Sequence, residues 1–225
     1  RMGEIPSSEE AISVVKNMAQ LTMTEPHAML ALSMLKDYDN YTFTHSVNVS
    51  VLALAVGRAC KLTENAKTLG LGGLLHDLGK LRVDVNIITK PGRLTDAEFE
   101  EIKEHPGFGA ESIKEMEGVT AEVMQIVHGH HLRYDRTGYP SDVAGETVSP
   151  LVEMTAIADA YDAMTTLRFT KALHTEESDC AVEGCRRLLL HPDFVTRFIE
   201  SLGPYPVGSL VRLDSNDIGL VTKVE

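Results

Sequence analysis

The sequence contains no tryptophan, only 5% aromatic residues and three cysteines, Cys60, Cys180 and Cys185. An odd number of cysteines without a Cys-x-x-Cys pair indicates a reduced, cytosolic setting. The sequence also lacks a signal peptide and any apolar run of about 18 residues, the length that a membrane span requires. We therefore expect a cytoplasmic domain that makes no membrane contact.

The chain also lacks basic charge, since 33 Asp and Glu outnumber 21 Lys and Arg and leave a net charge of -12. Such a charge argues against binding to nucleic acid polymers or to anionic membranes. An anionic small ligand would instead need local cations, either metal ions or a few well-placed Lys and Arg. The 43% hydrophobic content is mainly Leu, Val, Ala, Ile and Met, which suits packed helices.

Apolar periodicity and capping signals predict an all-α helical bundle. Helices are expected at about 7–21, 26–37, 44–60, 63–79, 95–105, 107–117, 119–131, 149–166, 175–190 and 192–202. Residues 81–94 and 132–147 are expected to be loops. The last twenty residues alternate apolar and polar side chains around Ser215-Asn216-Asp217, which predicts a small C-terminal β-hairpin.

The segment GGLLHDLGK, residues 72–80, places His76 and Asp77 among leucines, where unpaired polar groups are costly to bury. Other imidazoles and carboxylates lie on apolar helix faces or at helix ends: His45, His105, His130, His131 and Asp159. Each alone is compatible with an ordinary structural role. Five separate segments carrying such groups together favour a shared metal centre, which removes the cost of burying them.

Seven donors suit two cations, because one carboxylate can bridge a pair of metal ions that activate a water between them. Asp77 is the expected bridge. His45, His76 and Asp159 would complete one site, and His105, His130 and His131 the other. Mixed imidazole and carboxylate donors favour iron, manganese, nickel or zinc over calcium. Two alternatives stay open: Asp162 in place of Asp159, and His128 in place of His130.

These motifs resemble the HD superfamily of metal-dependent phosphohydrolases, and HHLRYDRTGYP, residues 130–140, is similar to the HD-GYP family. IADAYDAMTTLRFTKA and PYPVGSLVRL resemble the later segments of that family, so the similarity runs from about residue 25 to the end. The resemblance implies an HD-domain helical bundle with two divalent transition metal ions, most simply iron or manganese. It also implies hydrolysis of cyclic di-GMP to pGpG, and in many members onward to GMP.

Carried over by position, the seven donors named above match the family's metal ligands, and Asp77 and Lys80 match its catalytic residues. Expected substrate-binding residues are Lys80, Tyr139, Pro140, Arg168 and Lys171. Expected divisions are an N-terminal helix or linker at 1–25, an HD-GYP catalytic domain at 26–203 and the hairpin at 204–225. HD-GYP domains usually follow sensor or receiver domains, and the opening RMG suggests a piece of a longer protein. A GGDEF-type diguanylate cyclase is a further expected partner.

Three positions depart from the family pattern. Tyr41 stands where some members have a Glu for a third metal, which favours two ions here. Leu132 replaces a Glu after the paired histidines, and Arg136 replaces a Gly in the following loop. Three possibilities therefore stay open: 3′,3′-cGAMP as the substrate, a generic HD nucleotide phosphohydrolase, and a module that binds a cyclic dinucleotide or a cyclase without cleaving.

Overall fold

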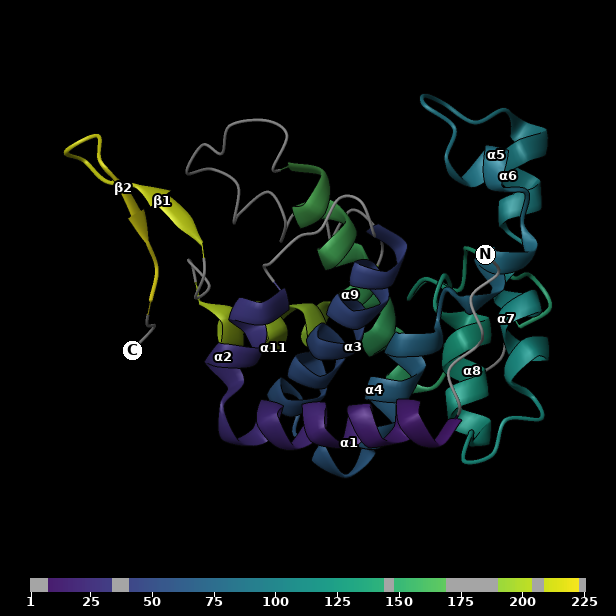
Figure 1. Cartoon of the computed structure of the whole chain (residues 1–225), viewed down its shortest axis with the longest axis horizontal. Coiled ribbons are helices and arrows are strands. Elements are labelled where there is room, and N and C mark those ends of the chain that lie inside the picture. Colours follow the sequence, from purple (N-terminus) through teal and green to yellow (C-terminus); the bar gives the residue numbers. More distant parts are fainter. Residues whose placement is uncertain (1–7, 34–40, 144–147, 169–189, 204–208, 223–225) are drawn as a thin grey trace.

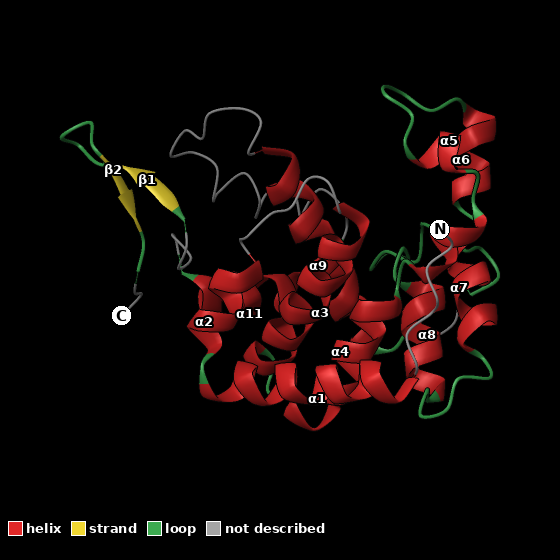
Figure 2. Cartoon of the chain, in the orientation of Figure 1, coloured by secondary structure: helices red, strands yellow, loops and turns green. Residues whose placement is uncertain are grey.

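The computed structural model describes residues 8–33, 41–143, 148–168, 190–203 and 209–222, and these residues are mostly helical (Figures 1 and 2). The longer helices are α1 (Ser8–Thr24), α2 (Pro26–Ser33), α3 (Tyr41–Ala59), α4 (Ala66–Leu75), α7 (His105–Ile113), α8 (Ala121–Gly129), α9 (Pro150–Arg168) and α11 (Pro192–Leu202). The shorter elements are η1 (Thr63–Asn65), η2 (Leu78–Arg82), α5 (Val85–Ile88) and α6 (Asp96–Ile102). The expected all-α bundle is confirmed.

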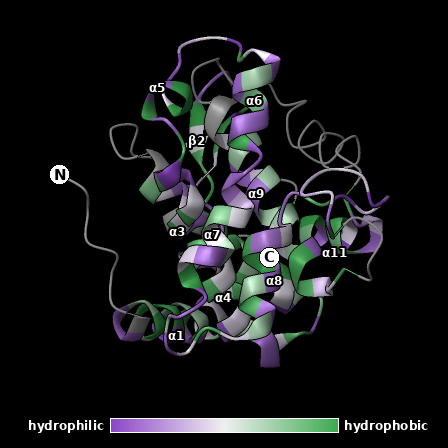
Figure 3. Ribbon diagram, turned by 90° about the vertical axis from the view of Figure 1, so that its right-hand side faces the viewer, coloured by the Kyte–Doolittle hydropathy of each residue, from purple (hydrophilic) through white to green (hydrophobic). Residues whose placement is uncertain are grey.

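The core is built around α3, which packs against both α4 and α9. Its largest apolar cluster includes Val49, Ile157 and Phe198, all fully buried. A second cluster joins Val15 of α1 to Ile113 of α7. Helix α1 lies across one end of the bundle and carries both hydrophilic and hydrophobic residues (Figures 1 and 3). It buries Ala11, Val15 and Met18, which occupy the i, i+4 and i+7 positions of one helix face.

The helix expected at 63–79 is wrong in detail, because it is divided into η1, α4 and η2. Helix α4 ends at Leu75, so His76 and Asp77 lie in the break between α4 and η2. The cause is a close approach of two backbones. A Cβ atom on Gly79 would overlap the carbonyl of His105 and the amide of Gly109 on α7.

The expected loop at 81–94 also contains a helical turn, α5, which Asp84 caps by accepting a 2.8 Å hydrogen bond from the Asn86 amide. The capping box of α6 is confirmed, with Thr95 and Glu98 each accepting a hydrogen bond from the other's backbone. Helix α11 matches the expected helix at 192–202. The helix expected at 175–190 lies outside the described residues.

The predicted C-terminal hairpin forms strands β1 (Leu210–Arg212) and β2 (Ile218–Leu220), which pair antiparallel with Leu210 opposite Leu220. Leu210, Ile218 and Leu220 are each more than half exposed. In the described part of the chain, no helix is both long enough and apolar enough to cross a membrane.

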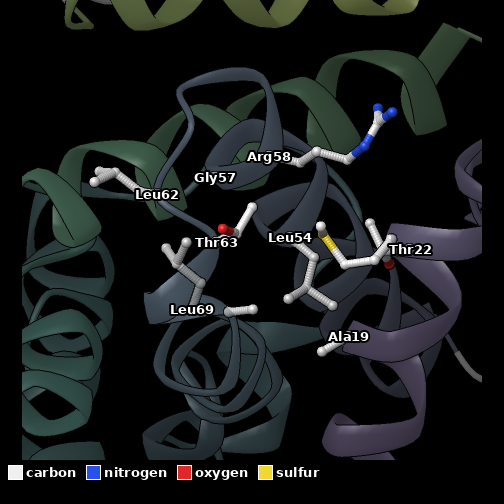
Figure 4. A pocket seen from close by; sticks show the side chains of 10 residues that line it. Ala19, Thr22, Leu54, Gly57, Arg58, Leu62, Thr63 and Leu69 are labelled. Carbon is white, nitrogen blue, oxygen red and sulfur yellow. The ribbon is translucent and has the colours of Figure 1, made fainter.

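A small pocket lies between α1, α3 and the start of α4 (Figure 4). Its lining is mostly apolar, with Leu54 and Leu69 opposite Ala19. It shares no residue with the His and Asp cluster described below.

Candidate metal centre

The ends of several helices bring the seven predicted ligands together. His76 caps the C-terminal end of α4, His105 begins α7 and His130 caps α8. His45 lies in the first turns of α3, and Asp159 lies at the middle of α9. The donor atoms fall into two groups, and within each group all of them lie within 4.8 Å of one another. One group is Asp77, His105, His130 and His131; the other is His45, His76 and Asp159.

The carboxylate of Asp77 lies between the two groups and faces each with a different oxygen. Its Oδ1 is 3.3 Å from Nε2 of His105 and 3.9 Å from Nε2 of His130. Its Oδ2 is 3.3 Å from Nε2 of His76 and 3.7 Å from Nε2 of His45. This arrangement is the one a carboxylate needs to bridge two cations.

Asp159 also reaches both groups. Its Oδ1 lies 3.0 Å from Nε2 of His45 and 3.9 Å from Nε2 of His76. Its Oδ2 lies 4.0 Å from Nδ1 of His131. The two carboxylates therefore span the centre from opposite sides, one from the α4–η2 break and one from α9.

Backbone carbonyls fix the orientation of three of the imidazoles. The Nδ1 atoms of His76, His105 and His130 lie 2.7, 2.7 and 2.9 Å from the carbonyl oxygens three residues earlier. A carbonyl only accepts, so each Nδ1 carries a proton, and in the neutral ring each Nε2 presents a lone pair to the centre.

Unpaired atoms remain at the middle of this arrangement. Among the described residues, the buried Nε2 of His76 and Oδ1 of Asp77 form no hydrogen bond. Buried acceptors without donors are costly, and a divalent cation satisfies them. The residues present therefore fit a metal ion on their own geometry.

The electrostatics of the centre separate neutral from charged groups. Burial lowers the pKa of His130 and that of His131, the latter to about 4, so both rings are neutral at pH 7. Burial also acts to lower the pKa of His45, but hydrogen bonds to Asp159 and Asp162 outweigh it and raise that pKa to about 9. Burial favours the protonated form of Asp77, yet His76 and Lys80 outweigh it and hold its pKa well below the usual range. Asp77 is therefore ionised.

The predicted substrate-binding residues are placed in part. The Lys80 ammonium donates to Oδ2 of Asp77 at 2.6 Å. The Tyr139 ring packs on His131 with centroids 4.5 Å apart, and a cis peptide bond joins it to Pro140. Arg168 ends α9, but its side chain is outside the described part of the structure, and Lys171 lies outside the described residues.

The residues considered as substitute ligands occupy different positions. Nε2 of His128 is 3.2 Å from Oδ2 of the exposed Asp142, and Asp162 contacts Nδ1 of His45.

Arg136, in a left-handed backbone conformation, extends toward Glu153 of α9, with Nη1 3.9 Å from Oε1. Leu132 is buried. Sequence reasoning did not anticipate the roles of Glu153 or of Asn48, which donates to Asp162 at 3.1 Å.

Comparison with known proteins agrees with this architecture. The HD domain family profile matches residues 16–182. This chain belongs to the HD domain family. Its histidine and aspartate cluster is thus a candidate metal centre in a family of metal-dependent phosphohydrolases.

Two curated relatives within this similarity are named as phosphodiesterases of cyclic dinucleotides. The chain is 38% identical to the Cyclic di-GMP phosphodiesterase PA4108 of Pseudomonas aeruginosa over 98% of its own length and 54% of the relative. It is 32% identical to the 3′3′-cGAMP-specific phosphodiesterase 1 of Vibrio cholerae over 63% of its length and 33% of the relative. The chain thus spans about half or less of these two curated relatives.

A solved structure shares the fold. Bd1817, described as a HDG"Y"P protein from Bdellovibrio bacteriovorus, superposes with a TM-score of 0.70 at 20% identity, covering 86% of this chain and 62% of that one. The resemblance to the HD superfamily inferred from the sequence is confirmed by the family profile, and the solved structure shares its fold.

Proposed function

We propose that this chain is the catalytic part of a cyclic di-GMP phosphodiesterase that produces pGpG, with GMP as the alternative final product. The observation that carries the proposal is the position of Asp77, whose two oxygens face separate groups of imidazole nitrogens. A phosphodiester hydrolase with two metal ions needs such a bridging carboxylate. The relative named as a cyclic di-GMP phosphodiesterase matches over almost the whole of this chain.

The proposed cofactors are two divalent transition metal ions, iron or manganese in preference to nickel or zinc. His45, His76 and Asp159 would hold one ion, His105, His130 and His131 the other, and Asp77 both. Bound ions would lower the pKa of water toward neutrality and offset the charge of the phosphate. Tyr41 begins α3 at the position of the third-metal Glu, which favours two ions over three; its side chain is outside the described residues.

The chain's own residues would bind and orient the substrate. Lys80, 28% exposed and anchored on Asp77, places a cation beside the centre, where it can stabilise charge that develops on the phosphate. Tyr139 and Pro140 would form the adjoining wall. Arg168 and Lys171 would add positive charge that a dianionic ligand requires in a chain of net charge -12.

A related substrate, 3′,3′-cGAMP, is the second candidate, because a relative with 32% identity is named as specific for it. Hydrolysis of a nucleotide by a generic HD phosphohydrolase and binding of a cyclic dinucleotide without cleavage are the remaining candidate functions. The proposed arrangement in the cell is a cytoplasmic catalytic domain, residues 26–203, regulated by an upstream sensor or receiver domain. A GGDEF-type diguanylate cyclase is a proposed partner.

The deciding experiment is an anaerobic assay of the purified chain loaded with Fe²⁺ or Mn²⁺, with metal content measured on the same sample. Cyclic di-GMP, 3′,3′-cGAMP, a linear dinucleotide and a dNTP would be supplied in parallel. We expect about two ions per chain and hydrolysis of cyclic di-GMP faster than of the three competing substrates. Faster cleavage of 3′,3′-cGAMP or of the dNTP would identify that compound, and not cyclic di-GMP, as the substrate. Binding without any product after long incubation would establish the module that does not cleave.

A further inference from the structure

Asp162 is a buried carboxylate on the Nδ1 side of His45, away from the candidate metal centre. It is 1% exposed, and its Oδ2 accepts a 2.7 Å hydrogen bond from Nδ1 of His45. Its Oδ1 accepts a 3.1 Å hydrogen bond from the side-chain amide of Asn48, one turn after His45 on α3. Two donors therefore hold this carboxylate in one orientation.

His45 thereby differs from the other histidines whose orientation the structure fixes. His76, His105 and His130 each turn Nδ1 toward a neutral backbone carbonyl. Among the candidate ligands in the described part of the chain, only His45 has Nδ1 at hydrogen-bond distance from a carboxylate, and its Nε2 faces the centre, 3.0 Å from Asp159. A carboxylate in this position makes the imidazole a more basic and better oriented metal ligand than a carbonyl does.

We infer that the two halves of the centre bind metal unequally and that Asp162 is the positioning residue responsible. The half with His45, His76 and Asp159 is the tighter one, and it fills first. The inference rests on the two-metal centre proposed above and adds an order of loading and a residue that sets it.

The geometry also excludes a simpler role for Asp162 as a ligand. Its two oxygens are engaged by His45 and Asn48 on the side of His45 away from Asp159. It is absent from both groups of converging donor atoms. Asp162 therefore acts through His45. Its removal should weaken metal binding by the group that contains His45 and leave binding by the group of His105, His130 and His131 unchanged.

The test is a titration of the metal-free chain with Mn²⁺, following free Mn²⁺ by electron paramagnetic resonance. Asp162→Asn keeps the size of the side chain and one acceptor oxygen but removes the charge. Glu153→Gln makes the same change at a buried acid earlier on α9 that lies outside both groups, and it serves as the matched control. Circular dichroism would verify that each variant is folded.

We expect two unequal binding steps in the unmodified chain and in Glu153→Gln. In Asp162→Asn, the tighter step should weaken by roughly 10- to 100-fold while the other stays unchanged. Crystals of this variant at low Mn²⁺ should show anomalous density among His105, His130 and His131 alone. Two equal steps in the unmodified chain, or equal weakening of both steps in the variant, would overturn the inference.

Failure of the inference and failure of the proposed function give different results. A chain that binds no Mn²⁺ would refute both. Unequal steps without hydrolysis of any cyclic dinucleotide would refute the function and leave the role of Asp162 standing. Equal binding steps with normal hydrolysis would refute the role of Asp162 and leave the proposed function standing.

Discussion

The Nε2 atoms of His105 and His130 face each other at 3.2 Å, and in the neutral rings neither carries a proton to share. Each ring donates its Nδ1–H to a carbonyl of its own chain segment, so two lone pairs point at the same space. Lone pairs in contact repel, and Oδ1 of Asp77 adds negative charge 3.3 Å from His105. A positive ion in this space converts the repulsion into coordination.

Replacing the bridging carboxylate should therefore remove metal and activity together. Asp77→Ala deletes the group that faces both sets of nitrogens, and we expect fewer than two bound ions per chain. The loss of turnover should exceed the roughly 10- to 100-fold that removal of an outer hydrogen-bond partner costs. Metal analysis and the cyclic di-GMP assay on one sample measure both. Full metal content with full turnover in this variant would refute the bridging role.

Lys80 should affect turnover without affecting metal content. Lys80→Met keeps the length of the side chain but removes the cation beside Asp77, and we expect kcat to fall by about 10²-fold. Arg82→Met is the matched control on the same η2 segment, because Arg82 pairs with the exposed Glu111 and packs over Phe108. Steady-state kinetics with metal quantification separate the two. Equal losses in both variants would indicate a general charge effect.

Gly79 should be the most sensitive glycine near the centre. Gly79→Ala forces η2 away from α7 because the new methyl group meets the backbone of His105 and Gly109. We expect a loss of about 3 kcal/mol in unfolding free energy and weaker metal binding, since His105 moves with α7. Gly107→Ala, on α7 with open space at its Cβ, should be neutral or stabilising by up to about 1 kcal/mol. Urea unfolding of both variants checks this, and similar midpoints would contradict it.

The cap of α6 should weaken in acid. A hydrogen bond from Lys90, with further ones from Thr95, lowers the pKa of Glu98 from its ordinary value of 4.5 to about 2. Because the folded pKa lies below the unfolded one, the stabilisation is present above pH 4.5 and is lost as the pH falls toward 2. The protection factor of the Thr95 amide, which donates a 2.7 Å hydrogen bond to the Glu98 carboxylate, should therefore fall across this range in the unmodified chain but not in Glu98→Gln. A flat profile in both would show that the carboxylate does not hold the cap.

The seven candidate ligands could be selected from the sequence because each lies on an apolar helix face or at a helix end and matches a motif of the HD superfamily. His76 and Asp77 follow two leucines, and Asp159 follows Ile157 and Ala158, so burial and polarity conflict visibly there. The division of these donors into two groups around Asp77 also matches the sequence prediction. Local patterns suffice where the signal is a polar residue in an apolar environment.

Features that depend on contacts between distant segments were not predictable. The break after Leu75 depends on how closely Gly79 approaches α7, which no local pattern reports. The sequence shows that Arg136 replaces a Gly of the family pattern, but its direction toward Glu153 becomes visible only when α9 is packed beside the loop. The orienting role of Asp162 likewise depends on α3 and α9 lying side by side.

The attachment of His76, His105 and His130 to carbonyls three residues earlier has a mechanical consequence. These rings have little freedom to adjust, so any rigid shift of α4, α7 or α8 moves a coordinating nitrogen by a comparable distance. A displacement at the outer surface of one of these helices would therefore change the distances among the candidate ligands without any contact at the centre itself.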